Sequence, residues 1–178
     1  MMNEKTKIRM SKFLSLVLRH RPETVGITLD SAGWVHVDAL LAGCRKADRT
    51  ISFEQLDEVV ATNDKKRFEF SADGEMIRAS QGHSVDVDLG YTPAEPPEIL
   101  YHGTAVQNIK AIRARGLVKG KRHHVHLSPN KTTAVNVGNR YGKPVVLEIC
   151  AAAMADEGIP FFVSTNGVWL TDNVPPDY

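Results

Sequence analysis

The stretch Gly90-Tyr-Thr-Pro-Ala-Glu-Pro-Pro-Glu98 decides how this chain of 178 residues is organised. Three of its residues are prolines, which block the continuation of helices and sheets and favour an extended spacer. We therefore predict a first domain over residues 1–90, a linker over 91–98 and a second domain over 99–178. Each piece has roughly 90 residues, which is small but sufficient for a hydrophobic core.

Apolar spacing in the first piece predicts three helices followed by a hairpin. A stripe with helical spacing ends before Pro22 and contains Met10, Phe13, Leu14, Val17 and Leu18. A second, short helix is expected over Val37–Ala42, and Ser52-Phe-Glu-Gln55 is a capping box that starts a third. Residues 67–71 and 75–79 alternate around the turn that ends at Gly74, as hairpin strands do. This order predicts a winged-helix-like lobe.

Short runs of β-forming residues dominate the second piece. Strands are expected at residues 99–102, 125–128, 144–149, 161–163 and 167–171. One helix is expected from Val106 to Arg115, ended by Gly116, and another from Lys131 to Val137. These elements predict an α+β fold with a mostly antiparallel sheet.

Composition excludes several classes of protein. The chain is 42% apolar and 24% charged, which is ordinary for a globular protein and excludes disordered and collagen-like chains. Its apolar runs are far shorter than the roughly 20 residues of a membrane span, and its first residues lack the apolar core of an export signal. Cys44 and Cys150 are far apart and are expected to be small apolar core residues in a reducing compartment. We therefore expect a cytoplasmic protein that does not bind membranes.

Positive charge is unevenly distributed, although the formal net charge is only +1. Residues 5–21 contain six Lys or Arg and no acid, and residues 110–122 again contain six and no acid. Lys65, Lys66 and Arg67 form a third cluster. Three acid-free clusters in a nearly neutral protein indicate local recognition of a polyanion.

Four of the seven histidines lie between residues 102 and 126. In Tyr101-His-Gly-Thr104 the histidine ends a strand, and the glycine would let a ligand approach the backbone closely. His124 and His126 share one strand face, but no third ligand has suitable spacing, so we expect no metal. The chain lacks the glycine-rich motif of Rossmann domains and the lysine motif of P-loops. It also lacks the serine motif and the paired carboxylates that would indicate hydrolysis.

Six short motifs occur in one order along the chain. They are Leu18-Arg-His-Arg-Pro22, Asp64-Lys-Lys-Arg-Phe68, Tyr101-His-Gly-Thr104, Arg122-x-His-Val-His-Leu-Ser128, Gly138-x-Arg-x-Gly-Lys-Pro-Val-Val146 and Asn166-Gly-Val-Trp-Leu-Thr171. Each motif alone is weak, but the ordered set resembles the NAD-dependent RNA 2′-phosphotransferase family, which comprises the tRNA 2′-phosphotransferases and their bacterial relatives. The resemblance covers about Ser11 to Thr171.

The resemblance implies both a fold and a reaction. It implies a winged-helix-like lobe that binds RNA phosphate, joined to a lobe of the ADP-ribosyltransferase type that binds NAD. An internal RNA 2′-phosphate would attack the nicotinamide-bearing ribose of NAD, and the ribose 2″-hydroxyl would then attack the phosphorus. The products would be RNA with a 2′-hydroxyl, ADP-ribose 1″,2″-cyclic phosphate and nicotinamide. NAD would be a co-substrate, no metal would be needed, the RNA would be tRNA-like, and we expect a monomer.

The resemblance also implies site residues. Phosphate handling falls on Arg19, His20, Arg67 and Arg122, which come from all three basic clusters, so that the cleft between the lobes would gather them. NAD binding falls on His102, Gly103, Thr104, His126, Leu127, Ser128, Gly138 and Arg140. The residue types suit this chemistry, because planar guanidinium groups match the oxygens of a phosphate that carries a charge of about −1.5 to −2. An imidazole with an ordinary pKa near 6.5 can carry protons at neutral pH.

Two other functions compete with this one. An ADP-ribosyltransferase of the same scaffold could modify terminal phosphates of RNA or DNA without resolving the adduct. Many ADP-ribosyltransferases carry a glutamate where this chain has Val168, and its absence favours a phosphate acceptor, which is already anionic. A non-enzymatic winged-helix regulator is disfavoured, because Glu54, Asp57 and Glu58 on the third helix would repel DNA phosphates.

Overall fold

The computed structural model describes residues 2–178, and its contacts divide them into two compact units. The first unit ends at Gly90 and the second begins at Tyr91. Helices and antiparallel strands are mixed in both units, so the chain is of the α+β class. Among the described residues, no helix is both long enough and apolar enough to cross a membrane.

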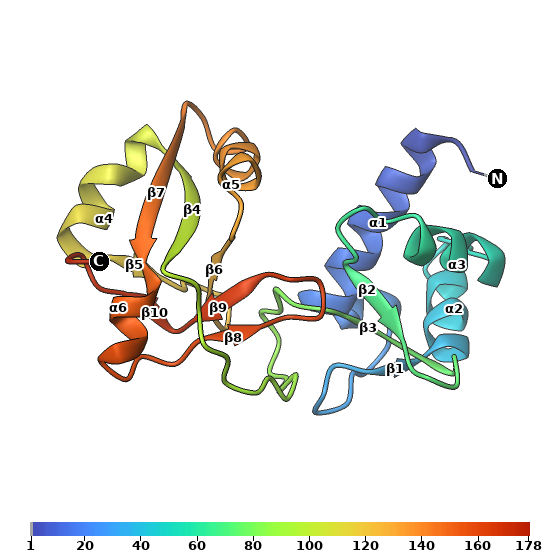
Figure 1. Cartoon of the computed structure of the whole chain (residues 1–178). Coiled ribbons are helices and arrows are strands. Elements are labelled where there is room, and N and C mark those ends of the chain that lie inside the picture. Colours follow the sequence, from blue (N-terminus) through green and yellow to red (C-terminus); the bar gives the residue numbers. More distant parts are fainter. Residues whose placement is uncertain (1) are drawn as a thin grey trace. The chain divides into compact units, whose positions relative to one another are not determined.

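The first unit combines three α-helices with a small antiparallel sheet (Figure 1). Its elements are α1 (Glu4–Arg19), the 3₁₀ helix η1 (Pro22–Val25), β1 (Val35–His36), α2 (Val37–Lys46), α3 (Phe53–Ala61), β2 (Phe68–Phe70) and β3 (Met76–Ala79). The sheet order is β1-β3-β2, with Val35 opposite Ile77 and Phe68 opposite Ala79. The three predicted helices and the hairpin are confirmed, whereas β1 was not predicted.

Local signals in the sequence explain where these helices begin and end. The Asn3 side chain caps α1 by accepting a bond from the Thr6 N–H, and Pro22 follows shortly after its end. The predicted capping box of Ser52 and Gln55 is present at the start of α3, with both of its hydrogen bonds formed.

The core of the first unit holds the C-terminal half of α1. Leu14, Val17 and Leu18 of the predicted stripe are completely buried, together with Leu40, Leu56 and Ile77 from the other elements. Burying an aliphatic side chain of this size contributes about 1.5–3 kcal/mol. The last turn of α1, which carries Arg19, is therefore fixed against the rest of the unit.

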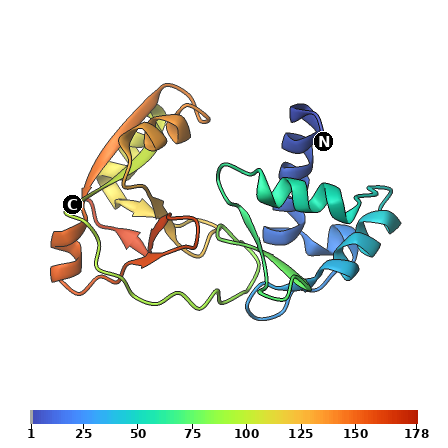
Figure 2. The ribbon, with the colours of Figure 1, turned by 45° about the vertical axis from the view of Figure 1, so that its right-hand side comes forward.

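The second unit has one long strand pair and several shorter ones. Its elements are β4 (Ile99–Ala105), the 3₁₀ helix η2 (Val106–Asn108), α4 (Ile109–Arg115), β5 (Leu117–Val118), β6 (Val125–Leu127), α5 (Lys131–Gly138), β7 (Pro144–Cys150), α6 (Ala151–Asp156), β8 (Phe162–Val163), β9 (Trp169–Thr171) and β10 (Asn173–Val174). Strand β4 pairs with β7, β9 lies between β6 and β8, and β5 pairs with β10, all antiparallel. Helix α5 lies beside β4 and β7 (Figures 1 and 2).

Residues 91–98, for which we predicted an extended linker, are attached along the second unit. The Ala94 N–H donates to the Phe161 carbonyl at 2.8 Å, and Pro93 forms an isolated bridge with Phe162. Pro96 is buried. The segment is extended, but these contacts hold it in place as the first part of the second unit.

The two cysteines occupy different environments. Cys44 lies in the core of the first unit, where burial raises the pKa of its thiol to about 11. The expectation that Cys150 is also a core residue is wrong, because it is exposed at the end of β7. It lies at the strand's last position, where the alternation of side chains points it away from the core that buries Ile149.

Candidate functional site

Two of the predicted phosphate residues, Arg19 and His20, lie at the C-terminal end of α1. Arg19 is the last residue of the helix and His20 is its C-cap. The Arg19 carbonyl accepts bonds from the N–H groups of Ser84 at 2.9 Å and Val85 at 3.4 Å, so the segment after β3 is attached to this helix end. Arg19 is half-buried and His20 is exposed. The helix macrodipole favours cations at this end.

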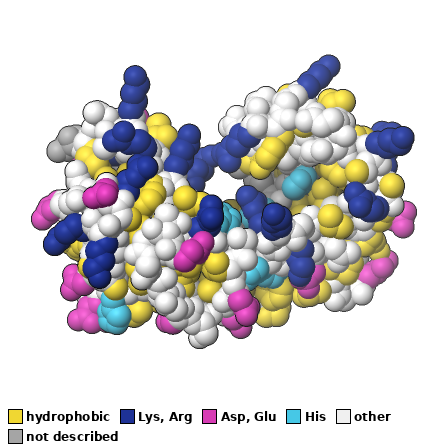
Figure 3. All heavy atoms as spheres, turned by 180° about the vertical axis from the view of Figure 1, so that it is seen from behind, with side chains coloured by type: hydrophobic (Ala, Val, Ile, Leu, Met, Phe, Trp, Pro, Cys, Tyr) yellow, Lys and Arg dark blue, Asp and Glu magenta, His cyan; other side chains and the backbone are white. Residues whose placement is uncertain are grey.

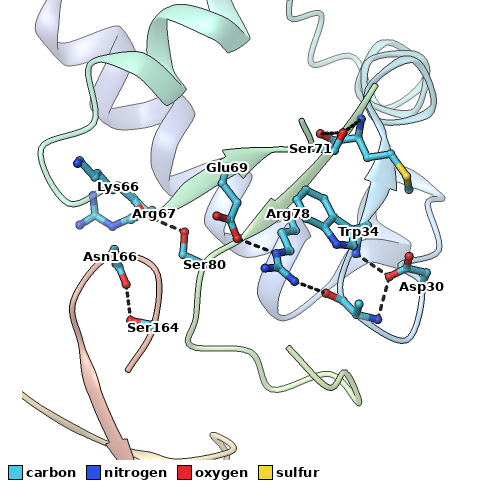
Figure 4. A network of polar contacts seen from close by, with 12 residues as sticks. Asp30, Trp34, Lys66, Arg67, Glu69, Ser71, Arg78, Ser80, Ser164 and Asn166 are labelled. Atoms are coloured by element: carbon cyan, nitrogen blue, oxygen red, sulfur yellow. Dashed lines mark hydrogen bonds and ion pairs between the residues drawn. The ribbon is translucent and has the colours of Figure 1, made fainter. Parts of the chain in front are cut away.

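The third predicted residue of this unit, Arg67, lies immediately before β2 (Figure 4). Its carbonyl accepts a bond from the Ser80 N–H at 2.9 Å and from Nη2 of Arg19 at 3.5 Å. Its own Nη1 donates to Oδ1 of Asn63 at 3.3 Å. The structure therefore brings Arg19, His20 and Arg67 together at one end of the first unit.

Two residues that the sequence did not single out orient this group. Asn63 contacts Arg67 through Oδ1, and its Nδ2 donates to Oγ of the buried Ser11 on α1 at 3.0 Å. Oγ of Ser84 lies 2.9 Å from Nδ1 of His20 and fixes the orientation of the ring. The position of Asn63 in a turn before Asp64–Phe68 was the only available signal, because asparagine often stabilises turns.

The second unit holds Arg122 next to two histidines. Nδ1 of His102, on β4, lies 3.0 Å from the carbonyl oxygen of His126. A carbonyl only accepts, so Nδ1 of His102 carries the proton. Burial lowers the pKa of His102, its bond to the His126 carbonyl partly offsets this, and the charge of Arg122 lowers it further. Nη1 of Arg122 donates to Nδ1 of His126 at 3.2 Å, so that Nδ1 of His126 is the acceptor.

Gly103 and Gly138 let β4 and α5 approach each other. A Cβ atom on Gly103 would overlap the carbonyl oxygen of Ala134, and one on Gly138 would lie 2.6 Å from the carbonyl oxygen of Thr104. We expected Gly103 to admit a ligand, but on the side of its missing Cβ the space is filled by the backbone of α5. The physical need for glycine here is close packing between a strand and a helix.

The other predicted NAD residues differ in what they can offer. Thr104 is buried, and its Oγ1 accepts a bond from Nδ2 of Asn108 at 3.1 Å. The side chain of Leu127 lies in the core of the second unit, so only its backbone could contact a ligand. Ser128 exchanges two backbone bonds of 2.8 Å with Tyr101, which joins the end of β6 to β4. Arg140 is exposed just after α5.

Nothing in the described residues indicates a metal centre. No group of three or more His, Cys, Asp or Glu residues among them could hold an ion. His124 instead belongs to an aromatic cluster, with its ring centroid 5.6 Å from that of Phe162 and 6.2 Å from that of Tyr91. Lys and Arg side chains extend from the protein surface at many points (Figure 3).

Comparison with known proteins gives a consistent result. The model of the RNA 2′-phosphotransferase, Tpt1 / KptA family matches residues 5–173. A probable RNA 2′-phosphotransferase of Pseudomonas aeruginosa (strain PAO1) is 55% identical over 175 residues, which cover 98% of this chain and 96% of that protein. A protein with the same description from Hahella chejuensis is 53% identical over 99% of this chain and 95% of that protein. Another from Escherichia coli O45:K1 is 50% identical over 99% of this chain and 91% of that protein.

Proposed function

Since the chain belongs to the RNA 2′-phosphotransferase, Tpt1 / KptA family, which removes 2′-phosphates from RNA, we propose that it transfers the phosphate to NAD in two steps. In the first, an oxygen of the RNA 2′-phosphate attacks the ribose carbon that bears nicotinamide, and neutral nicotinamide leaves. In the second, the ribose 2″-hydroxyl attacks the phosphorus and loses its proton. The bond to the RNA 2′-oxygen breaks, that oxygen takes up a proton, and ADP-ribose 1″,2″-cyclic phosphate is released.

The grouping of Arg19, His20 and Arg67 is the observation that carries this proposal. Three donors from two distant segments of the sequence, the pair Arg19 and His20 and the single Arg67, are held at one end of the first unit by hydrogen bonds to the backbone or to other side chains. A phosphate monoester carries about −1.5 to −2 charges, and guanidinium groups match its oxygens. The second step concentrates charge on these oxygens, so fixed cations lower its barrier most.

We assign NAD to the second unit, with His102, Gly103, Thr104, His126, Leu127, Ser128, Gly138 and Arg140 as its binding residues. The lowered pKa of His102 supports this assignment, because it disfavours the imidazolium form, which the cationic nicotinamide ring of NAD would repel. Arg122 completes the phosphate-handling set from this unit. We further propose that the reaction uses NAD as a co-substrate and needs no metal.

The topology of each unit supports a finer description of the fold. We describe the first unit, with the order α1-β1-α2-α3-β2-β3, as a winged-helix-like lobe over residues 1–90 that binds RNA phosphate. We describe residues 99–178 as an ADP-ribosyltransferase-like lobe. We further propose that the enzyme acts on tRNA-like RNA in the cytoplasm as a monomer.

The direct test is incubation of the chain with an RNA that bears one internal 2′-phosphate, with and without NAD. We expect loss of the 2′-phosphate only with NAD, together with one nicotinamide and one cyclic phosphate per RNA. Phosphate loss without NAD would contradict the proposed co-substrate. ADP-ribose joined stably to a terminal phosphate, without cyclic product, would instead identify the enzyme as a terminal-phosphate ADP-ribosyltransferase.

The two steps should also be separable by mutation. Replacing Arg19, His20 or Arg67 with alanine should slow the second step far more than the first, because the first uses a nucleophile that is already charged. Loss of one such donor typically costs about a hundred- to a thousand-fold in rate, so RNA-2′-phospho-ADP-ribose should accumulate. Substitutions in Tyr101–Thr104 should weaken NAD use without accumulation. Unmodified RNA alone in the Arg19→Ala reaction would contradict this division of roles.

A further inference from the structure

The outer face of α1 carries cations that the proposed reaction does not use. Lys5, Arg9 and Lys12 are all exposed, and their spacing of four and three residues places them on one side of the helix. The opposite side carries the buried residues Ser11, Leu14, Val17 and Leu18. We call the three residues Lys5, Arg9 and Lys12 the α1 cation row.

In the part of the chain that the structure describes, the acidic side chains near α1 interact with Lys7 and not with the α1 cation row. Among the described residues 4–12, the ion pair joins Lys7 to Glu4 at 3.0 Å. The pKa of Lys7 is raised by its bond to Glu4 and also by the charges of Glu58 and Asp64, so these acids act on Lys7. No ion pair neutralises the α1 cation row among the described residues.

The stability of the helix does not explain these charges. The macrodipole favours acids in the first turn, and Lys5 is a cation in that turn. Arg9 and Lys12 have no carboxylate four residues before or after them to pair with, because Glu4 is the only acid of α1. A binding role accounts for cations that the fold itself does not need.

The row leads along the helix to Arg19. At 1.5 Å per residue, Lys12 lies about 10 Å, Arg9 about 15 Å and Lys5 about 21 Å from Arg19 along the axis. Because the helix packs on the core through its inner face, these separations are fixed. A stacked RNA strand has one phosphate per roughly 3.4 Å, so Lys12 would meet the backbone about three nucleotides from a phosphate held by Arg19.

We propose that the α1 cation row binds the sugar–phosphate backbone of the RNA strand that flanks the 2′-phosphate. This inference rests on the proposed role of Arg19 and His20 in holding that phosphate. Contacts to backbone phosphates carry no sequence information, so the row would increase the affinity for the substrate strand without selecting bases. The exposed Ile8 and Leu16 lie on the same side of the helix and offer apolar contacts between the charges.

The test compares two double variants that remove the same charge. Arg9→Gln/Lys12→Gln alters the row, and Arg45→Gln/Lys46→Gln alters exposed cations in the last turn of α2. Glutamine is a good helix former, so both variants should fold. Binding of a ten-nucleotide RNA with one 2′-phosphate near its centre is measured without NAD by fluorescence anisotropy at several salt concentrations. A trinucleotide with the same 2′-phosphate serves as the short ligand.

The row predicts a specific pattern. On single strands each phosphate contact contributes roughly 0.7 to the slope of log affinity against log salt concentration. For the long RNA, the row variant should therefore show a slope smaller by about 1.4, which corresponds to a loss of affinity of roughly 25-fold at 0.1 M salt. Its affinity for the trinucleotide should equal that of the unaltered protein, and the α2 variant should match that protein for both ligands. Equal losses in both variants, or equal losses for both RNAs in the row variant, would overturn the proposal.

The reaction and the binding surface can fail separately in this design. With NAD, the row variant should process the trinucleotide at the rate of the unaltered protein. If no variant consumes NAD but the row variant still loses affinity only for the long RNA, the proposed reaction fails and the RNA surface stands. If all variants process both RNAs alike at low RNA concentration, the reaction stands and the surface is refuted.

Discussion

Replacing Gly103 with alanine tests why β4 needs a glycine. The added methyl group would overlap the carbonyl oxygen of Ala134, and it would lie 2.6 Å from the carbonyl carbon of that residue and 2.9 Å from the backbone nitrogen of Gly138. All three atoms belong to the backbone of α5, so no side chain can rotate away. The helix as a whole must move, by roughly 1.5–2 Å if ordinary contact distances are to be restored.

The expected cost follows from this geometry. Overpacking a rigid core costs typically about 1–3 kcal/mol, and a contact made only of backbone belongs in the upper part of that range. Alanine recovers roughly 0.5–1 kcal/mol over glycine within a strand. The net loss should be about 2 kcal/mol for the second unit, which corresponds to a fall in Tm of roughly 8–16 °C for a domain of this size.

Urea unfolding can measure this loss in the second unit alone. In a Trp34→Phe background, fluorescence reports on Trp169, which packs against the core of that unit. Gly120→Ala adds the same methyl group in open space and should cost only the strain of its positive φ, about 1–2 kcal/mol, without forcing any helix to move. An unchanged urea midpoint for Gly103→Ala would refute the packing argument, and the proposed role in NAD binding would then be the remaining reason for this glycine.

Three further predictions concern the site. Asn63→Ala removes the acceptor for Nη1 of Arg67 and should slow the second step about tenfold, measured as the ratio of intermediate to product, whereas Thr62→Ala on the same turn should not. The pKa of His102 is lower in the folded state than in the unfolded state, so the unfolded state binds more protons than the folded state as the pH falls below about 6.5. The free energy of unfolding therefore decreases in that range. In His102→Gln, the urea midpoint should therefore decrease less between about pH 7 and 5 than it does in the unaltered protein. An equal decrease in both proteins would contradict this. A chelator should not change the rate, and activity restored by a divalent ion would prove a metal requirement.

Much of the first unit was predictable because its signals are local. The apolar stripe of α1 and the capping box of α3 depend on residues within a few positions of each other. Strand β1 has only two residues, and it exists because Val35 and His36 pair with Ile77 and Met76 of β3, about forty residues later. No local pattern marks such a strand.

The second unit shows the same limit more often. Strands β5 and β10 are two-residue segments defined by their pairing with each other, and neither was predicted. Helix α6 was also missed, since it follows β7 directly, with no proline or glycine between Cys150 and Ala151 to indicate a boundary. The longer β4 and β7 were found because β-forming residues continue over most of their length.

The residues of the candidate site also fall into those that sequence motifs indicate and those that only the structure reveals. The ordered motifs named four residues for the proposed phosphate role, and the structure brings three of them, Arg19, His20 and Arg67, together. The sequence could not name Asn63 or Ser84, because a single side chain that holds another has no spacing of its own. It also did not reveal that the backbone of α5 packs against Gly103, because a need for close approach does not show what approaches.

The position of Arg19 and His20 bears on their proposed role in holding phosphate. Many phosphate sites use a helix N-terminus, where backbone N–H groups and the positive end of the dipole attract the anion. Here the two residues lie at a C-terminus, whose partial negative charge repels a phosphate but stabilises cationic side chains. Attraction must therefore come from the side chains alone, and these remain stabilised when no phosphate is present. With the proposed role, an RNA that has lost its 2′-phosphate lacks the anion these side chains would hold, so removal of the phosphate itself should weaken the binding of the product.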